Sequence, residues 1–175
     1  MSLMNHQWSL SADALGVILP CCYLSWAVAK DTGMPQSQIV AHFQAQADQL
    51  LAGDLERFVE MYSLPLPIHS PGGLTVVVDP EGGTDFLNQM RAEWAKRGVV
   101  ALRPDVSAIE LPKANRFRVW IDWKEINAAG VEAPGSTIIY YCRKGPTGLR
   151  TEMMQYTRIA TPGLVTDQTL IARSA

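Results

Sequence analysis

The sequence has no concentration of positive charge and little cysteine. Its 175 residues include 15 Lys and Arg against 17 Asp and Glu, spread along the chain, and the formal net charge is −2. Nucleic-acid binding requires a concentrated basic face, so we expect no nucleic-acid partner. Two of the three cysteines, Cys21 and Cys22, are adjacent, and three cysteines are too few for a disulfide framework. We therefore predict reduced thiols.

Motifs for cofactors and metals are missing as well. The three histidines, His6, His42 and His69, lie far apart, without the spacing of metal ligands. No GxGxxG or GxxxxGK[ST] pattern occurs, and Gly72-Gly73 and Gly82-Gly83 follow prolines closely enough to indicate turns. We predict no metal and no cofactor.

The composition, with 47% hydrophobic and 18% charged residues, is that of a globular protein, and the length suits one folded domain. We expect an apolar N-terminal extension over residues 1–33, a folded domain over 34–162 and a C-terminal tail over 163–175, which is either mobile or paired with a neighbour. The uncharged run 14–29 is too short, and too interrupted by Pro20, to span a membrane.

The role of this extension can be interpreted in several ways. Met1-Ser2-Leu3 resembles a tag remnant, and Met34 is an alternative translation start. The run 14–29 resembles a signal-peptide core ending in the small-x-small triplet 27–29, although no Lys or Arg precedes it. The remaining interpretation is an arm that packs on the domain or on a partner subunit. We expect a cytoplasmic protein, or an exported one if 14–29 acts as a signal, and no membrane partner.

Three helices are predicted before most of the strands, because apolar residues recur at helical spacing with one buried face each. The helices are predicted over Gln38–Leu51, Asp54–Tyr62 and Thr84–Arg97. Ser37, Asp54 and Thr84 are the residue types that cap helix N-termini. Between the second and third helices, a hairpin is predicted to join an extended segment at 64–68 to a strand at 74–78.

Four β-type segments follow between Val99 and Ala160. The segment Arg116–Ile126 alternates strictly, with Phe117 and Trp123 on an apolar face and charged residues on the other, which indicates a strand packed on a core. Helices followed by consecutive strands predict an α+β fold with the helices on one face of an antiparallel or mixed sheet.

Several segments carry a resemblance to a known family. They are AQADQLLAGDLERFVEMYSLPL (45–66), GGTDFLNQMRAEW (82–94), RFRVWIDWKEINAAG (116–130), STIIYYCRK (136–144) and LRTEMMQYTRIA (149–160). In order and hydrophobicity they resemble the nuclear transport factor 2-like superfamily, the cystatin-like α+β barrels that include SnoaL-like polyketide cyclases and ketosteroid isomerases. The resemblance covers roughly residues 35–160. It implies a conical curved sheet wrapped around three helices, a small-molecule pocket, and a homodimer through the outer sheet face.

A pocket in such a fold lies between the apolar sheet face and the helices. Its predicted lining is Phe58, Tyr62, Met90, Trp94, Phe117, Trp123, Tyr141 and Met154. The same residues also suit a plain hydrophobic core. Tyr140 and Tyr141 are adjacent in a strand, so one points inward and one outward, and the sequence leaves open which.

Acid–base chemistry needs a titratable group in the pocket. The catalytic candidates are Asp122, Glu125 and Tyr140. Asp122 shares a face with Arg118 and Lys124, which indicates the outer face, whereas Glu125 shares a face with Trp123. Glu152 and Tyr156, on one face of the last strand by simple alternation, are further polar candidates.

Arg118, Trp120 and Asp122 are predicted to form a dimer interface on the outer face, because a tryptophan on a flat strand is costly to leave in water. Three functions remain open. They are a domain that binds a small molecule, an acid–base enzyme (isomerase, dehydratase or cyclase) on a small apolar substrate, and an interaction module whose pocket is filled by its own side chains.

Overall fold

The computed structural model describes residues 34–160 and 170–171. These residues contain three helices, α1 (Gln36–Ala52), α2 (Leu55–Val59) and α3 (Pro80–Lys96). The strands are β1 (Leu66–Ser70), β2 (Gly73–Val77), β3 (Val99–Ile109), β4 (Arg116–Asn127), β5 (Glu132–Gly145), β6 (Gly148–Arg158) and β7 (Leu170–Ile171). The predicted extension over residues 1–33 lies outside the described residues.

The strands form one mixed sheet in the order β3-β4-β5-β6-β1-β2-β7. Neighbours from β3 to β6 are antiparallel, whereas β1 joins β6 in parallel through Ile68 opposite Met154. In the tail, β7 pairs in parallel with β2 of the same chain. The α+β fold class with a mixed sheet is confirmed.

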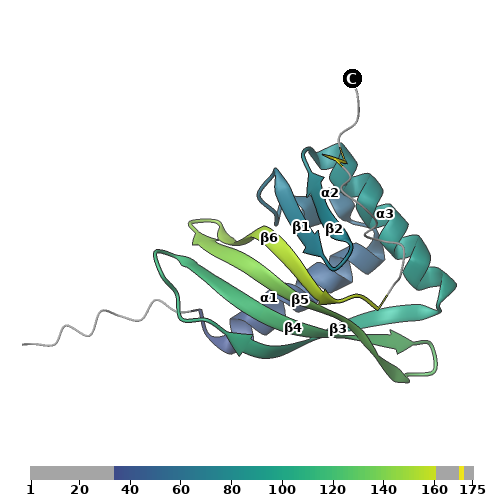
Figure 1. Ribbon diagram of the computed structural model, residues 1–175. Helices are drawn as coiled ribbons and strands as arrows, with labels where there is room; N and C mark the ends of the chain where they lie inside the picture. The colour runs from purple at the N-terminus through teal and green to yellow at the C-terminus, as the bar shows by residue number, and fades with distance from the viewer. Residues whose placement is uncertain (1–33, 161–169, 172–175) are drawn as a thin grey trace, which may run out of the picture. The chain divides into compact units, whose positions relative to one another are not determined.

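The sheet curves because its long strands contain β-bulges, which increase the local twist. Register shifts occur in the β3–β4 pairing, between Asp122 and Lys124 against β5, and between Tyr141 and Cys142 against β6. In Figure 1 the long strands β4 to β6 cross in front of α1, and α3 lies near the β1–β2 hairpin. Contacts join α1 to β3, and α3 to α2, β2 and β3. The helices and the buried sheet face therefore enclose the core.

Side-chain alternation decides which face of β4 meets the helices. Phe117, Val119 and Ile121 are at most 4% exposed, and the intervening residues are half-buried or exposed. On the helical side, Phe43 of α1 is fully buried and its ring centroid lies 4.6 Å from that of Tyr140. These contacts place the centre of the core between α1 and the middle of β4 and β5.

Two helix starts differ from the sequence prediction. Helix α3 begins after Asp79, whose carboxylate accepts a hydrogen bond from the backbone N–H of Gly82 (2.7 Å), rather than at Thr84. Pro80 suits the first helical turn because no N–H is needed there, so Gly82-Gly83 lies in the helix and not in a turn. Helix α1 follows Pro35 without a side-chain cap, so Ser37 does not cap it.

The C-terminus of α1 is tied to α3. Gly53 ends α1 with φ +88°, a left-handed conformation that favours glycine. A Cβ at this position would lie 2.9 Å from the Arg91 guanidinium, which donates to the carbonyl oxygen of Leu51 (3.2 Å). None of the helices in residues 34–160 is long and apolar enough to span a membrane.

Candidate functional site

A cavity of about 80 Å³ lies between the buried sheet face and the helices. Its apolar wall comes from Ala47, Leu50, Phe58, Val59, Leu64, Leu66, Ile68, Val77, Gly83, Phe86, Leu87, Met90, Trp94, Leu102, Trp123, Ile138 and Met154. Its polar lining residues are Gln46, Tyr62, Glu125, Ser136, Tyr140 and Tyr156. The wall is thus mainly hydrophobic with a few polar groups, as in small-molecule sites.

Six of the predicted lining residues border this cavity, and two lie elsewhere. The six are Phe58, Tyr62, Met90, Trp94, Trp123 and Met154. Phe117 is buried at 4% exposure, opposite Cys142 and outside the lining. Tyr141 projects from the opposite sheet face, where its hydroxyl donates to Gln155 Oε1 (3.1 Å). Its neighbour Tyr140, which is 3% exposed, is the inward one.

Three tyrosines belong to the cavity lining. Burial raises the pKa of Tyr62, Tyr140 and Tyr156 above the ordinary value, so these phenols stay neutral and act through hydrogen bonds rather than as bases. The Tyr140 hydroxyl oxygen accepts a hydrogen bond from Trp123 Nε1 (2.9 Å). Within the described part of the chain, nothing bonds to the hydroxyls of Tyr62 and Tyr156. Both hydroxyls therefore keep their capacity to donate and to accept a hydrogen bond.

Gln46 is a polar lining residue that the sequence analysis missed. It is 2% exposed, and its Nε2 lies 3.2 Å from Nε2 of His42, one helical turn earlier. Because an amide nitrogen only donates, the His42 nitrogen accepts, and burial lowers the pKa of His42 and keeps its ring neutral. Gln46 Oε1 has no partner among the described residues. The i, i+4 spacing of His42 and Gln46 was the available sequence signal.

Glu125 is part of the lining, but other side chains occupy its carboxylate. Trp94 Nε1 donates to Oε1 (3.2 Å), and Arg97 donates to Oε2 (2.6 Å) and Oε1 (2.9 Å). The carboxylate side chain is 7% exposed and that of Arg97 33%. Arg97 and the Trp94 indole thus hold both oxygens of this carboxylate in hydrogen bonds.

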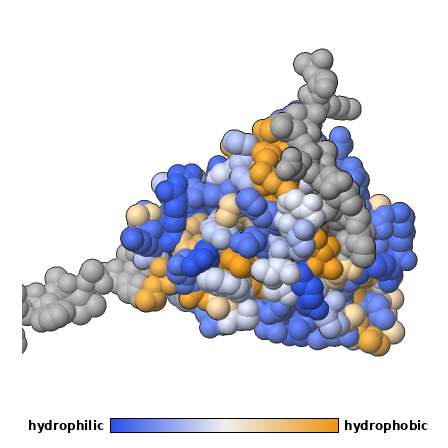
Figure 2. Space-filling view, viewed as in Figure 1, coloured by the Kyte–Doolittle hydropathy of each residue, from blue (hydrophilic) through white to orange (hydrophobic). Residues whose placement is uncertain are grey.

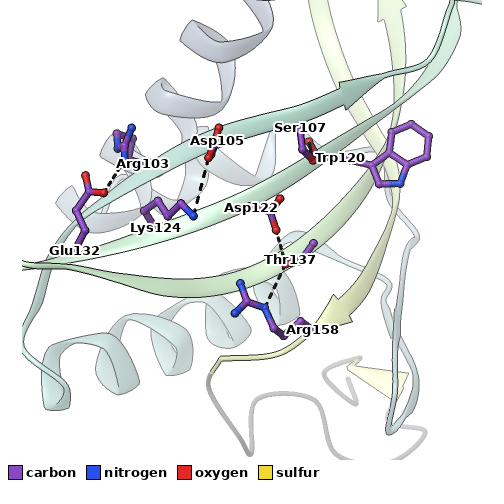
Figure 3. A network of polar contacts seen from close by, with 9 residues as sticks. All are labelled: Arg103, Asp105, Ser107, Trp120, Asp122, Lys124, Glu132, Thr137 and Arg158. Atoms are coloured by element: carbon purple, nitrogen blue, oxygen red, sulfur yellow. Dashed lines mark hydrogen bonds and ion pairs between the residues drawn. The ribbon is translucent and has the colours of Figure 1, made fainter.

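Asp122 lies on the sheet face opposite the cavity. Its carboxylate accepts a hydrogen bond from Thr137 Oγ1 (2.6 Å), which in turn accepts one from Arg158 Nε (3.3 Å), as Figure 3 shows. Asp105 pairs with Lys124 nearby (4.0 Å). Asp122 therefore shares no site with Glu125 or Tyr140.

Glu152 also lies away from the cavity, although simple alternation placed it beside Tyr156. The register shift in the β5–β6 pairing leaves Glu152 between the paired residues Thr151 and Met153. An extra residue in one strand reverses the alternation on its far side, so Tyr156 lines the cavity and Glu152 joins arginines of the outer face.

The predicted dimer residues Arg118 and Trp120 lie on this outer face. The Arg118 guanidinium is 5.0 Å from the Trp120 ring centroid, a cation–π distance, and it pairs with Glu110 through two hydrogen bonds (2.9 and 3.0 Å). Trp120 is half-buried and its neighbour across the strand pair is Ile139.

The described residues contain no cluster of three or more His, Cys, Asp or Glu side chains able to hold a metal. Cys142 is buried beneath the sheet, and burial raises its thiol pKa to about 12. A nucleophilic thiolate at this position is therefore disfavoured.

Several solved structures of low sequence identity have this fold. A domain of unknown function with a cystatin-like fold from Nostoc punctiforme is 19% identical, with 72% of this chain and 78% of that chain covered and a TM-score of 0.54. An NTF-2 like protein of unknown function from Shewanella oneidensis is 15% identical, with coverages of 70% and 98% and a TM-score of 0.52. ActVI-ORFA from Streptomyces coelicolor is 12% identical, with coverages of 70% and 93% and a TM-score of 0.53.

No protein-family model and no curated protein matches the sequence. The likeness to these solved structures extends over about 70% of the chain. The chain therefore has the nuclear transport factor 2-like, cystatin-like fold that the sequence resemblance predicted.

Proposed function

We propose that the cavity binds a small, largely apolar molecule through its apolar wall and one polar group. The observation that carries this proposal is a hydrophobic cavity whose lining includes two buried tyrosines, Tyr62 and Tyr156, without hydrogen-bond partners among the described residues. A ligand oxygen can pair with either hydroxyl, and such a hydrogen bond would add to the affinity that the apolar wall provides. Gln46 Oε1 offers an acceptor for a ligand hydroxyl in the same lining.

The volume of the cavity limits the size of the ligand. About 80 Å³ is smaller than the ~150 Å³ cavity that binds benzene in an engineered protein. Met90 and Met154 are in the wall, and methionine side chains change rotamer at low cost. We expect these two side chains to move when a ring-sized ligand enters.

The binding proposal has better support than acid–base catalysis. An enzyme of that class needs a base with access to the substrate, and Glu125, the one carboxylate among the described lining residues, already accepts three hydrogen bonds. Membership of the SnoaL-like branch, and an isomerase, dehydratase or cyclase activity, stay predictions.

Phenol and toluene, which differ by a hydroxyl against a methyl group, are the probes that test this proposal. In NMR titrations, Tyr156→Phe should weaken phenol binding about fivefold, the value of one hydrogen bond, and leave toluene binding unchanged. Tyr141→Phe removes the same hydroxyl from the outer face and is the matched control.

Ala47→Leu adds three carbon atoms to the cavity wall and should abolish the binding of both probes. Native mass spectrometry of protein purified from its own host would then identify the natural ligand. An absence of saturable binding for either probe, or equal effects of Tyr156→Phe and Tyr141→Phe, would contradict the proposal.

The second proposal is a homodimer through the outer sheet face, supported by the half-buried Trp120, with Ile139 opposite it, on a strand face away from the core. Trp120→Glu should give a monomer in sedimentation analysis, because it replaces the large apolar contact of the proposed interface with a charge. Leu111→Glu is the control, since Leu111 is 82% exposed and lies outside the strands. An unchanged mass for Trp120→Glu would refute the interface.

The proposal also includes a cytoplasmic location and a functional domain that spans residues 34–162.

A further inference from the structure

Three adjacent strands have an arginine at the same register near one end of the sheet. Arg116 of β4 is paired with Arg143 of β5, and Arg143 is paired with Arg150 of β6. Neighbouring strands lie about 4.8 Å apart, so the three residues form a row across the sheet. Like charges directly opposite each other are destabilising in a sheet. The row therefore lowers the stability of the folded protein, so the stability of the fold does not explain why three arginines lie there.

One carboxylate compensates part of this charge. Glu152 accepts hydrogen bonds from Arg116 Nε (2.7 Å) and Nη2 (3.2 Å), and its other contact is an ion pair with Arg143 Nε (2.9 Å). Arg150 has no carboxylate partner among the described residues. Guanidinium groups stay protonated in proteins, so one negative charge faces three positive ones.

The contacts of Glu152 also leave N–H groups of the arginines available to a ligand. Glu152 contacts Arg143 through Nε, which leaves the terminal nitrogens of that guanidinium as donors. The side chains of Arg116 and Arg143 are 64% and 49% exposed, so the donors are accessible. Glu152 thus holds two guanidinium groups in place without using all of their N–H groups.

The row borders a groove of about 480 Å³ formed by residues 114–116, 143–147 and 150. None of these residues lines the apolar cavity. In Figure 2 blue, hydrophilic side chains gather over the end of the molecule at which the β5–β6 turn lies in Figure 1. The groove is therefore a polar site separate from the cavity.

We propose that this groove binds a phosphate-bearing anion between Arg116, Arg143 and Arg150. The planar guanidinium fork matches phosphate oxygens with paired hydrogen bonds, and several arginines together suit a polyphosphate or a phosphomonoester headgroup. Such an anion would supply the negative charge that the arginine row lacks.

The test is calorimetric titration with tripolyphosphate, together with sedimentation of vesicles that contain phosphatidic acid. Arg150→Gln should weaken binding about tenfold, because a charge-assisted contact is lost. Arg103→Gln is the matched control, since Arg103 is an outer-face arginine of β3 that pairs with Glu132. It should change binding less than twofold. Binding of tripolyphosphate alone would assign the groove to a soluble ligand, and binding that requires vesicles would assign it to a lipid headgroup.

Thermal unfolding gives a second readout. Without phosphate, Arg150→Gln should unfold at the same or a higher temperature than the unmodified protein, because repulsion in the row is relieved. Tripolyphosphate should raise the unfolding temperature of the unmodified protein and not that of the variant. Equal weakening by Arg150→Gln and Arg103→Gln, no saturable binding of either probe, or binding of a single-stranded oligonucleotide without tripolyphosphate binding would overturn the proposal.

Discussion

Replacing Arg97 with methionine should lower the free energy of unfolding by about 3 kcal/mol, because it leaves the buried carboxylate of Glu125 without its charged partner. Glu125 is 6% exposed, and Arg97 supplies two of its three hydrogen bonds. The remaining donor, the Trp94 indole, is neutral. Methionine retains most of the aliphatic volume, so the loss comes mainly from the unpaired charge.

Urea unfolding of two further variants separates this effect from a general loss of charge. Arg103→Met removes an exposed arginine from an ion pair whose side chains are 50% and 46% exposed, and it should cost less than about 1 kcal/mol. The double variant Arg97→Met/Glu125→Leu should be more stable than Arg97→Met alone, because the unpaired buried charge is gone. If Arg97→Met and Arg103→Met cost the same, the Glu125 pair has no special role in stability.

The second large effect is expected from Gly135→Ala. A Cβ at Gly135 would lie 2.8 Å from the backbone oxygen of Trp123 and 3.1 Å from Cγ of Glu125. Gly135 lies where the β4–β5 pairing shifts register. We expect a loss of about 3 kcal/mol, at the upper end for overpacking, together with weaker phenol binding because Trp123 and Glu125 are cavity residues.

Gly145→Ala is the matched control for this substitution. Gly145 ends the same strand, and a Cβ there would be 3.7 Å from the oxygen of Gly148, which is an ordinary contact. It should change the midpoint of urea unfolding little. If Gly135→Ala had the same stability and phenol affinity as Gly145→Ala, the close approach of β4 and β5 would not be required for stability or for phenol binding.

Alternation in the sequence placed the residues of β4 correctly. The two-residue period put Glu125 with Trp123 and Asp122 with Arg118, and the structure has them on those faces. The same reasoning failed for Glu152, because a bulge in the β5–β6 pairing reverses the alternation along β6. A bulge depends on how two strands pair, so the sequence of one strand does not reveal it.

The helix starts also show which features the sequence predicts and which it does not. Apolar periodicity predicted all three helices, but Gly82-Gly83 suggested a turn where α3 already begins. The cap at Asp79 and the proline after it outweigh the low helix propensity of two glycines. Gly83 also packs closely, since a Cβ there would be 3.3 Å from a Val59 methyl group.

The sequence by itself determined the helix-then-strand order, the α+β fold class and the inward face of β4, because these follow from periodicities within short segments. Only the tertiary structure decided that Tyr140 rather than Tyr141 faces the cavity, that Arg97 holds Glu125, and that three arginines form one row. These features join residues far apart in the chain. They depend on strand register and on the space left between packed side chains, neither of which local sequence patterns specify.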